Sequence, residues 1–254
     1  MPKEIERTWS LNSDTYFEKR ADGSTDRLAK WQRNWEGYTE QQKRPAFHLP
    51  ETHPLLLKYL QRLRSGSAAD PAAKERVLVP LCGKTVDLCF LREQGMWVMG
   101  VEGVQQAVDD FEKEQGVEFA KSSEGEFRWH RATDICILQG DWFAVSPSQF
   151  EQLFDSAWDR ASLVALPPQS RPQYAEVLAS LIRSQGRVLL VTIEYPQAQK
   201  EGPPFSVPED QVQEHFAPFF AIELLEERPE PPRWGVDWVT ERAYLLTRKD
   251  SSRL

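Results

Sequence analysis

The sequence predicts an α/β fold: a doubly wound, mostly parallel, seven-stranded sheet with a helical segment added at the N-terminus. From about residue 76 onward, short apolar runs alternate with amphipathic runs of helical period. The first apolar run, Val77 to Leu81, leads into a turn at Gly83, and the second ends in an acidic residue, Glu102. A sheet of six or seven strands with its helices needs about 200 to 250 residues. The 254 residues of the chain supply them within one domain.

The N-terminal quarter has a different pattern. Residues 1–24 are polar and aperiodic, so we expect a flexible segment. Leu28, Trp31 and Trp35 share one helical face, which predicts a helix ending at Gly37.

A second helix is expected from Pro54 to Arg64, followed by a small, polar linker. We interpret residues 25–64 as a helical cover over the active site. Residues 25–254 then form a single domain that includes this cover.

The alternating core follows. Near-continuous apolar runs are typical of parallel strands buried on both faces. The expected strands are Val77–Leu81, Trp97–Val101, Ile135–Leu138, Phe154–Trp158, Val188–Ile193, Phe220–Leu225 and Trp238–Leu246, with a short extra strand at Phe127–Trp129.

Glycines mark the expected ends of three core helices, at Gly95, Gly116 and Gly186. Ser206 to Glu209 fits a capping box, which predicts a last short helix ending at Phe216.

Composition narrows the class of protein. The net charge is −8 and no cluster of Lys and Arg is visible, which argues against nucleic acid as a partner. Cys82, Cys89 and Cys136 lack metal-ligand spacing and do not form a disulfide framework. No apolar run approaches the roughly 18 residues of a membrane span, and no signal-peptide pattern is present. We expect a cytoplasmic protein that needs no membrane or metal and is monomeric.

Aromatic residues are numerous, with nine Trp and thirteen Phe. They suit either the apolar walls of a pocket for flat ligands or simply a well-filled core.

Candidate site residues fall at the predicted carboxyl ends of strands, where such sheets bind ligands. They are Leu81 to Gly83, Glu102, Gly140–Asp141 and Asp159–Arg160. Three of them have plainer interpretations: Leu81 as a core residue, Glu102 as a solvated loop residue, and Asp159–Arg160 as a structural ion pair. Their convergence at one rim favours a binding site.

The spacing of the first turn indicates which cofactor fits. A carboxylate at Glu102 can accept hydrogen bonds from the two hydroxyls of a ribose. The turn has one glycine, not Gly-x-Gly-x-x-Gly, which argues against NAD or FAD. Lys84–Thr85 has no upstream P-loop glycine, which argues against ATP or GTP. S-adenosylmethionine has an adenosine but no phosphate, so it tolerates this turn.

Several segments resemble the thiopurine S-methyltransferase family, over about residues 25 to 248. They are Trp31–Trp35, Phe47–His48, Val79–Lys84 (Val-Pro-Leu-Cys-Gly-Lys), Gly100–Glu102, Trp158–Arg160 (Trp-Asp-Arg), Gly202–Phe205 and Trp234–Gly235. The resemblance implies a class I methyltransferase, Rossmann-like fold. It also implies S-adenosyl-L-methionine as donor, S-adenosyl-L-homocysteine as product, and small aromatic or heterocyclic thiols such as thiopurines as acceptors.

The resemblance also implies roles for individual residues. The donor would contact Trp31, Leu81, Glu102 (at the ribose), Gly140 and Asp141 (at the adenine), and Arg160. Phe47 would face the acceptor ring, and a second arginine would approach the acceptor. The sequence leaves open whether that arginine is Arg228 or Arg233, because extra prolines separate them.

Some points stay open. The segment between Trp35 and Phe47 is longer than in the mammalian family members, so the path of Tyr38–Arg44 is not determined.

Arg160 is the candidate catalytic residue, because its guanidinium would favour a thiolate over a neutral thiol. The alternatives are a halide, selenium, tellurium or small inorganic thiol acceptor, or a protein that binds the donor without catalysis.

Overall fold

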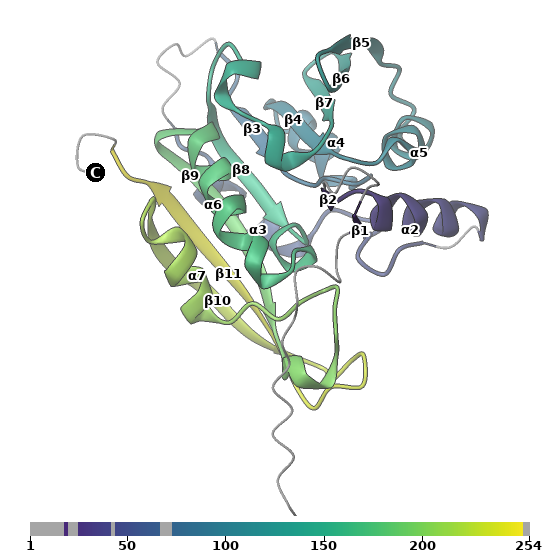
Figure 1. Ribbon diagram of the computed structural model, residues 1–254. Coiled ribbons are helices and arrows are strands. Elements are labelled where there is room, and N and C mark those ends of the chain that lie inside the picture. Colours follow the sequence, from purple (N-terminus) through teal and green to yellow (C-terminus); the bar gives the residue numbers. More distant parts are fainter. Residues whose placement is uncertain (1–17, 20–24, 42–43, 67–72, 251–254) are drawn as a thin grey trace, which may run out of the picture.

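Nine strands form the central sheet of the computed structural model, which describes residues 18–19, 25–41, 44–66 and 73–250 (Figure 1). They are β3 (Arg76–Val79), β4 (Trp97–Glu102), β5 (Ala120–Glu124), β6 (Phe127–Ala132), β7 (Ile135–Gln139), β8 (Phe154–Arg160), β9 (Ile182–Glu194), β10 (Phe220–Glu230) and β11 (Val239–Arg248). Their order across the sheet is β10-β11-β9-β8-β3-β4-β7-β6-β5.

The centre of the sheet is parallel and its edges are antiparallel. β9, β8, β3, β4 and β7 pair in parallel, while β10 and β11 close one edge and β6 and β5 close the other. After β3 the chain winds outward through β4 and β7, then crosses back to β8 on the other side of β3. This reversal creates the switch point at which doubly wound sheets bind ligands.

The predicted fold class is confirmed, but the strand count of seven was too low. All seven expected runs form strands, and the short extra strand is β6. The ninth strand, β5, was missed because all five of its residues are exposed, so it has no apolar alternation to detect.

Helices cover both faces of the sheet (Figure 1). One face packs against α3 (Pro54–Leu63), α4 (Asp87–Glu93) and α5 (Gln105–Gln115), and the other against α6 (Arg171–Leu181) and α7 (Glu209–Phe216). Side chains along β3 alternate between the two faces of the sheet. Val77 and Val79 pack in the core that includes α3, α4 and α5, and Leu78 packs in the core that includes α6 and α7.

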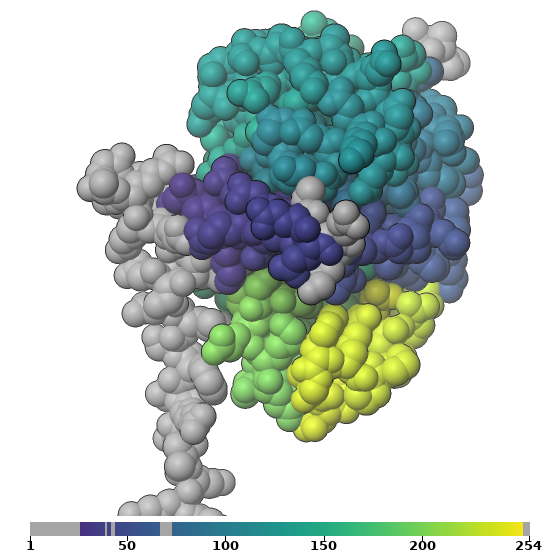
Figure 2. Space-filling view, turned by 90° about the vertical axis from the view of Figure 1, so that its right-hand side faces the viewer, coloured from purple at the N-terminus to yellow at the C-terminus, as the bar shows by residue number. Residues whose placement is uncertain are grey.

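The N-terminal part crosses the molecule between its two halves. α2 (Ala29–Glu40) packs on α5, and Figure 2 shows it as a purple band between the teal part of the chain and the green and yellow parts. Before it, β1 (Glu18–Lys19) pairs with β2 (Thr25–Asp26). The other residues of the predicted flexible segment, 1–17 and 20–24, lie outside the described residues, as do 42–43 and 67–72.

Two glycines predicted to end helices do so, since Gly95 and Gly116 follow α4 and α5 with φ of 82° and 62°. Gly37 lies inside α2 instead, on a side where a Cβ would meet nothing within 4 Å. Gly186 lies inside β9, because α6 already ends at Leu181. A Cβ at Gly186 would lie 2.9 Å from the carbonyl oxygen of Asp155, so strand contact explains this glycine.

The predicted capping box at Ser206 is wrong. α7 begins at Glu209 with Pro208 as its N-cap, and no side chain caps it. Ser206 is buried, and its Oγ accepts a hydrogen bond from the backbone N–H of Tyr195 at 3.0 Å. Within the described residues, the helices are too short or too polar to cross a membrane.

Candidate functional site

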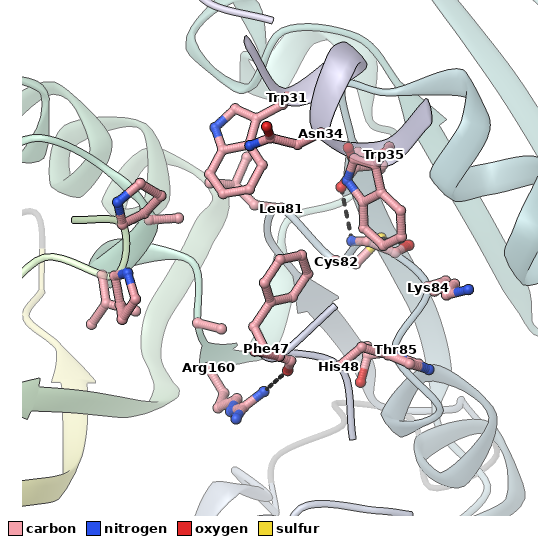
Figure 3. A pocket seen from close by; sticks show the side chains of 18 of the residues that line it. Trp31, Asn34, Trp35, Phe47, His48, Leu81, Cys82, Lys84, Thr85 and Arg160 are labelled. Carbon is pink, nitrogen blue, oxygen red and sulfur yellow. Dashed lines mark hydrogen bonds between the residues drawn. The ribbon is translucent and has the colours of Figure 1, made fainter. Parts of the chain in front are cut away.

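A cavity of about 450 Å³ opens at the carboxyl ends of β3, β4 and β8, beneath the N-terminal segment (Figure 3). Six of the residues singled out in the sequence line it: Trp31, Phe47, Leu81, Glu102, Arg160 and Arg233. They come from the N-terminal segment, the turn after β3, two strand ends and the loop before β11. The fold therefore gathers residues that are up to two hundred positions apart.

The first turn is held in an unusual backbone conformation. β3 ends at Val79, so Leu81 lies beyond the strand, with a φ of 43°. Gly83 has a φ of 53°, and a Cβ there would lie 3.1 Å from the ring of Trp35. Both the positive φ and this close approach favour glycine at this position.

Glu102, at the end of β4, holds that turn in place. One carboxylate oxygen accepts the backbone N–H of Gly83 and the other that of Val104, each at 2.8 Å. The side chain is buried, and burial raises its pKa, although hydrogen bonds from backbone N–H groups oppose the rise. Each oxygen keeps a second lone pair, so the carboxylate can also accept hydrogen bonds from a ligand.

The cover over the cavity is built from aromatic rings. Asp26 caps the start of α2 by accepting the backbone N–H of Leu28 and Ala29 at 3.0 and 2.9 Å. Phe47 meets the rings of Trp31 and Trp35 edge to face, with centroids 6.1 and 5.7 Å apart. These rings close the cavity from above (Figure 3).

Arg160, the last residue of β8, joins the cover to the sheet. Its Nη1 donates a hydrogen bond to the carbonyl oxygen of Phe47 (Figure 3). Burial lowers the pKa of the guanidinium, and the nearby carboxylates of Asp87 and Glu241 raise it again. A guanidinium remains a cation under these conditions, so the half-buried side chain of Arg160 brings a positive charge and further N–H donors to the cavity.

Asp159 does not pair with Arg160. Successive residues of a strand point to opposite faces. The Asp159 carboxylate therefore lies in the core on the far side, where Tyr174 Oη donates to it at 2.7 Å. The structural ion pair that the sequence left open is not formed.

Of the two candidate arginines, Arg233 lines the cavity and Arg228 does not. Arg228 lies on β10, where it pairs with Glu230 at 2.6 Å and Glu241 at 2.7 Å. Its side chain is 45% exposed; Glu230 ends the same strand, and Glu241 lies near the start of the adjoining strand β11.

Gly140 and Asp141 lie beside the cavity but are not part of its lining. The backbone N–H of Gly140 donates to the carbonyl oxygen of Glu102 at 3.0 Å, so the two strand ends are adjacent. Asp141 pairs with Arg27 at 3.3 Å and accepts the backbone N–H of Phe143 at 3.0 Å.

The sequence analysis missed several polar residues of the cavity. Asp87 is buried and accepts hydrogen bonds from the backbone N–H of His53 at 3.0 Å and from Trp158 Nε1 at 2.8 Å. Glu241 is also buried and lines the cavity. Its inward position between Val239 and Ala243, in an alternating strand, was a detectable signal.

Lys84 was considered only as part of a P-loop. It lines the cavity, is buried, and pairs with Glu114 at 2.6 Å and Asp110 at 3.4 Å. These contacts could not be derived from local spacing, because the partners come from α5.

Known proteins share the sequence over almost this whole region. A family model described as thiopurine S-methyltransferase matches residues 27–249. A thiopurine S-methyltransferase from Pseudomonas paraeruginosa is 44% identical over 208 residues, covering 80% of this chain and 92% of that protein. One from Shewanella loihica is 40% identical over 209 residues, covering 80% and 93%.

Solved structures share the fold at low identity. A SAM-dependent methyltransferase from Anabaena variabilis superimposes with a TM-score of 0.62 at 12% identity, covering 92% of this chain and 99% of that one. Magnesium protoporphyrin IX methyltransferase from Synechocystis, with bound SAH, gives 0.54 at 13% identity and covers 90% of each chain. S-adenosylmethionine is the methyl donor of this fold. With the matched sequence, these findings establish that the chain belongs to the thiopurine S-methyltransferase family of methyltransferase enzymes.

Proposed function

We propose that the chain transfers a methyl group from S-adenosylmethionine to the sulfur of an aromatic or heterocyclic thiol. The observation that carries this proposal is that one cavity is bordered by both the buried carboxylate of Glu102 and the half-buried side chain of Arg160. A carboxylate fits ribose hydroxyls, and a guanidinium fits a sulfur anion.

In the donor half, Glu102 would hold the ribose hydroxyls with the lone pairs that Gly83 and Val104 leave free. Trp31 would cover the donor and Leu81 would contact it from the first turn. The residues present therefore fit this cofactor.

Gly140 and Asp141 would border the adenine. Their position beside the end of β4 supports this role, and Asp141 keeps acceptor capacity beside its contact with Arg27.

In the acceptor half, Phe47 would face the acceptor ring, and Arg233 would be the second arginine. Bound S-adenosylmethionine supplies an activated methyl group on a positively charged sulfur. The protein has to align the acceptor, exclude water and favour the nucleophilic form of the sulfur. Arg160 would perform the last task, and the rings of Trp31 and Phe47 would exclude water.

The aromatic cover favours a ring-bearing acceptor over a halide or a small inorganic anion, because flat apolar side chains gain most from contact with another ring. The test is a panel of a heterocyclic thiol, an arenethiol, iodide and selenide, with formation of S-adenosylhomocysteine as the readout. Faster turnover of the ring-bearing thiols supports the proposal. Faster turnover of iodide or selenide would refute it.

Arg160→Met tests the role of the guanidinium. Without the cation, the bound thiol ionises less readily. We expect kcat/KM to fall about ten- to a hundredfold at low pH, corresponding to about 1.5 to 3 kcal/mol for a hydrogen bond to a charged group. The loss should shrink at high pH, where the thiol is already ionised. Arg131→Met, on β6 and outside the cavity lining, is the control, and equal losses at every pH would argue against anion stabilisation.

A further inference from the structure

A second carboxylate faces the acceptor half of the cavity. Glu241 lies on β11, is 8% exposed, and lines the cavity together with Arg160 and Arg233. Nothing in the proposed roles of the donor-binding residues uses it. A buried carboxylate in a ligand cavity, beside the proposed acceptor, calls for a chemical explanation.

The register of the sheet places Glu241 on the same face as Arg160. Arg160 is the neighbour of Val191 on β9, and Glu241 is the neighbour of Ile193 on the same strand. Residues two apart on a strand share a face, and Val191 and Ile193 both line the cavity. The two charged side chains therefore flank one patch of apolar floor. Two strand spacings, or about 10 Å, separate their strands.

The contacts of Glu241 fix its orientation and leave one oxygen available. Oε2 accepts a hydrogen bond from Arg228 at 2.7 Å. Oε1 lies 4.0 Å from His53 Nε2, and the hydrogen bonds found among the described residues do not engage it.

His53 cannot supply a competing positive charge. Its Nδ1 accepts the backbone N–H of Leu55 at 3.2 Å, so a neutral ring carries its hydrogen on Nε2. Burial, together with the positive charges of Arg160 and Arg228, lowers the pKa of this ring to about 3. His53 therefore faces Glu241 as a neutral donor.

Methylation of a heterocyclic thiol in its thione form requires the loss of a ring proton, which methylation of an arenethiol does not. In the thione tautomer, the carbon–sulfur bond is double and a neighbouring ring nitrogen carries a hydrogen. Methylation of the sulfur leaves the ring cationic unless that hydrogen departs as a proton. A base on the ring side of the acceptor removes this obstacle.

Resting on the proposed function, we infer that Glu241 is a catalytic base that takes the ring N–H proton of thione acceptors. The thione sulfur forms the new bond to the methyl carbon, and the electrons of the broken methyl–sulfonium bond go to the donor sulfur. The N–H electron pair forms a carbon–nitrogen double bond, the carbon–sulfur double bond becomes single, and the proton goes to Oε1. The sulfonium and the carboxylate both end neutral, and Glu241 later releases the proton to water.

The pKa of Glu241 is raised from its usual value, which is the direction that favours proton uptake by a base. Burial raises its pKa, Arg228 opposes that rise, and Glu230 adds to it. Arg160 and Arg233 lower it from the cavity side. His53, from the segment before α3, faces Glu241 from a further side and is neutral.

The test is Glu241→Gln, assayed with a thione that carries a ring N–H and with an arenethiol. We expect kcat for the thione to fall about a hundredfold at neutral pH, which is within the range for a lost general base. The ratio of thione to arenethiol kcat/KM should fall at least tenfold. The thione defect should disappear above the acceptor's own pKa, where the free acceptor has already lost its proton. Equal losses for both acceptors, or a thione loss that persists at high pH, would overturn the inference.

Glu230→Gln is the matched control, since Glu230 also pairs with Arg228 but does not line the cavity. Glu230→Gln should leave the ratio of thione to arenethiol kcat/KM unchanged. If this ratio falls as it does in Glu241→Gln, the effect belongs to the loss of a partner for Arg228 and not to a base. The unmutated enzyme supplies a second measurement that needs no variant. Its thione kcat should fall as the pH drops through the range in which a carboxylate is protonated, while its arenethiol kcat should lack that fall. Identical profiles would refute the role of Glu241, whereas failure to methylate either acceptor would instead refute the proposed function.

Discussion

At the residue scale, Glu102 both holds the turn after β3 in place and is the residue proposed to bind the ribose. Its two oxygens hold the backbone N–H groups of Gly83 and Val104, which border the cavity on either side of the carboxylate. Removing the side chain therefore affects both the shape of the first turn and the hydrogen bonds proposed for the ribose.

Glu102→Ala is expected to weaken donor binding about ten- to a hundredfold, since a hydrogen-bonded buried carboxylate contributes about 1.5 to 3 kcal/mol. Calorimetry with S-adenosylhomocysteine measures this directly. Asp109→Ala is the control, because Asp109 is an exposed carboxylate that only contacts Gln105 on its own helix. Unchanged affinity in a folded Glu102→Ala protein would contradict the ribose role.

The burial of Asp159 should make the free energy of unfolding depend on pH. Burial raises the pKa of this carboxyl from 3.8 to about 6, although the hydrogen bond from Tyr174 opposes the rise. The folded state thus binds its proton more tightly than the unfolded state. Its contribution to stability is complete below pH about 4 and is lost as the pH rises through about 6.

Asp159→Asn removes this titration. Relative to the unmutated protein, the free energy of unfolding of the variant should improve by up to about 3 kcal/mol between pH 4 and pH 7. Denaturant unfolding at several pH values measures the difference. A constant difference across that range would show that Asp159 does not titrate as described, whatever the absolute effect of the amide.

At the scale of elements, the two N-terminal helices have different roles. α3 contributes Leu55, Leu56, Leu60 and Leu63 to the main core on one face of the sheet. α2 belongs to a small separate cluster, in which Trp35 packs with Val104 and Ala107. The predicted cover of residues 25–64 therefore contains one helix over the cavity and one helix built into the core.

Leu56→Ala tests that division. Leu56 is fully buried, so its truncation should cost about 2 to 5 kcal/mol of unfolding free energy. Leu57, its neighbour on the same helix, is 54% exposed, and Leu57→Ala should change stability by about 0.5 kcal/mol or less. Thermal or denaturant unfolding compares the two variants, and equal losses of stability would contradict the assignment of α3 to the core.

At the scale of the whole molecule, the cavity needs the sheet and the cover together. The sheet supplies Glu102 and Arg160, and the segment through His48 supplies the rings that close the cavity. The cover also connects the two halves of the molecule, as the band across Figure 2 shows.

Deletion of residues 1–48 should therefore leave a folded protein that has lost turnover, because α3 and the main core remain while Trp31, Trp35 and Phe47 are gone. Circular dichroism reports the fold, and S-adenosylhomocysteine formation reports the activity. Deletion through residue 64 should also unfold the sheet by removing the buried leucines of α3. Retained turnover in the shorter deletion would show that the cover is dispensable.

The fold and much of the candidate site could be predicted because their signals are local. Apolar runs, helical periods and glycine turns act within about ten residues, and Glu102 and Arg160 could be placed at strand ends by counting. β5 was not predictable in this way, because an exposed edge strand has no buried face to leave a pattern.

By itself, the sequence determined most of the succession of strands and helices along the chain and the rim of the sheet at which the cavity opens. Only the tertiary structure decided which of Arg228 and Arg233 reaches the cavity, and that the carboxylates of Asp87 and Glu241 both lie near Arg160. The physical reason is distance along the chain. Side chains more than 150 residues apart are brought together by sheet order and packing, and hydrophobic periodicity within a segment does not encode which strands become neighbours.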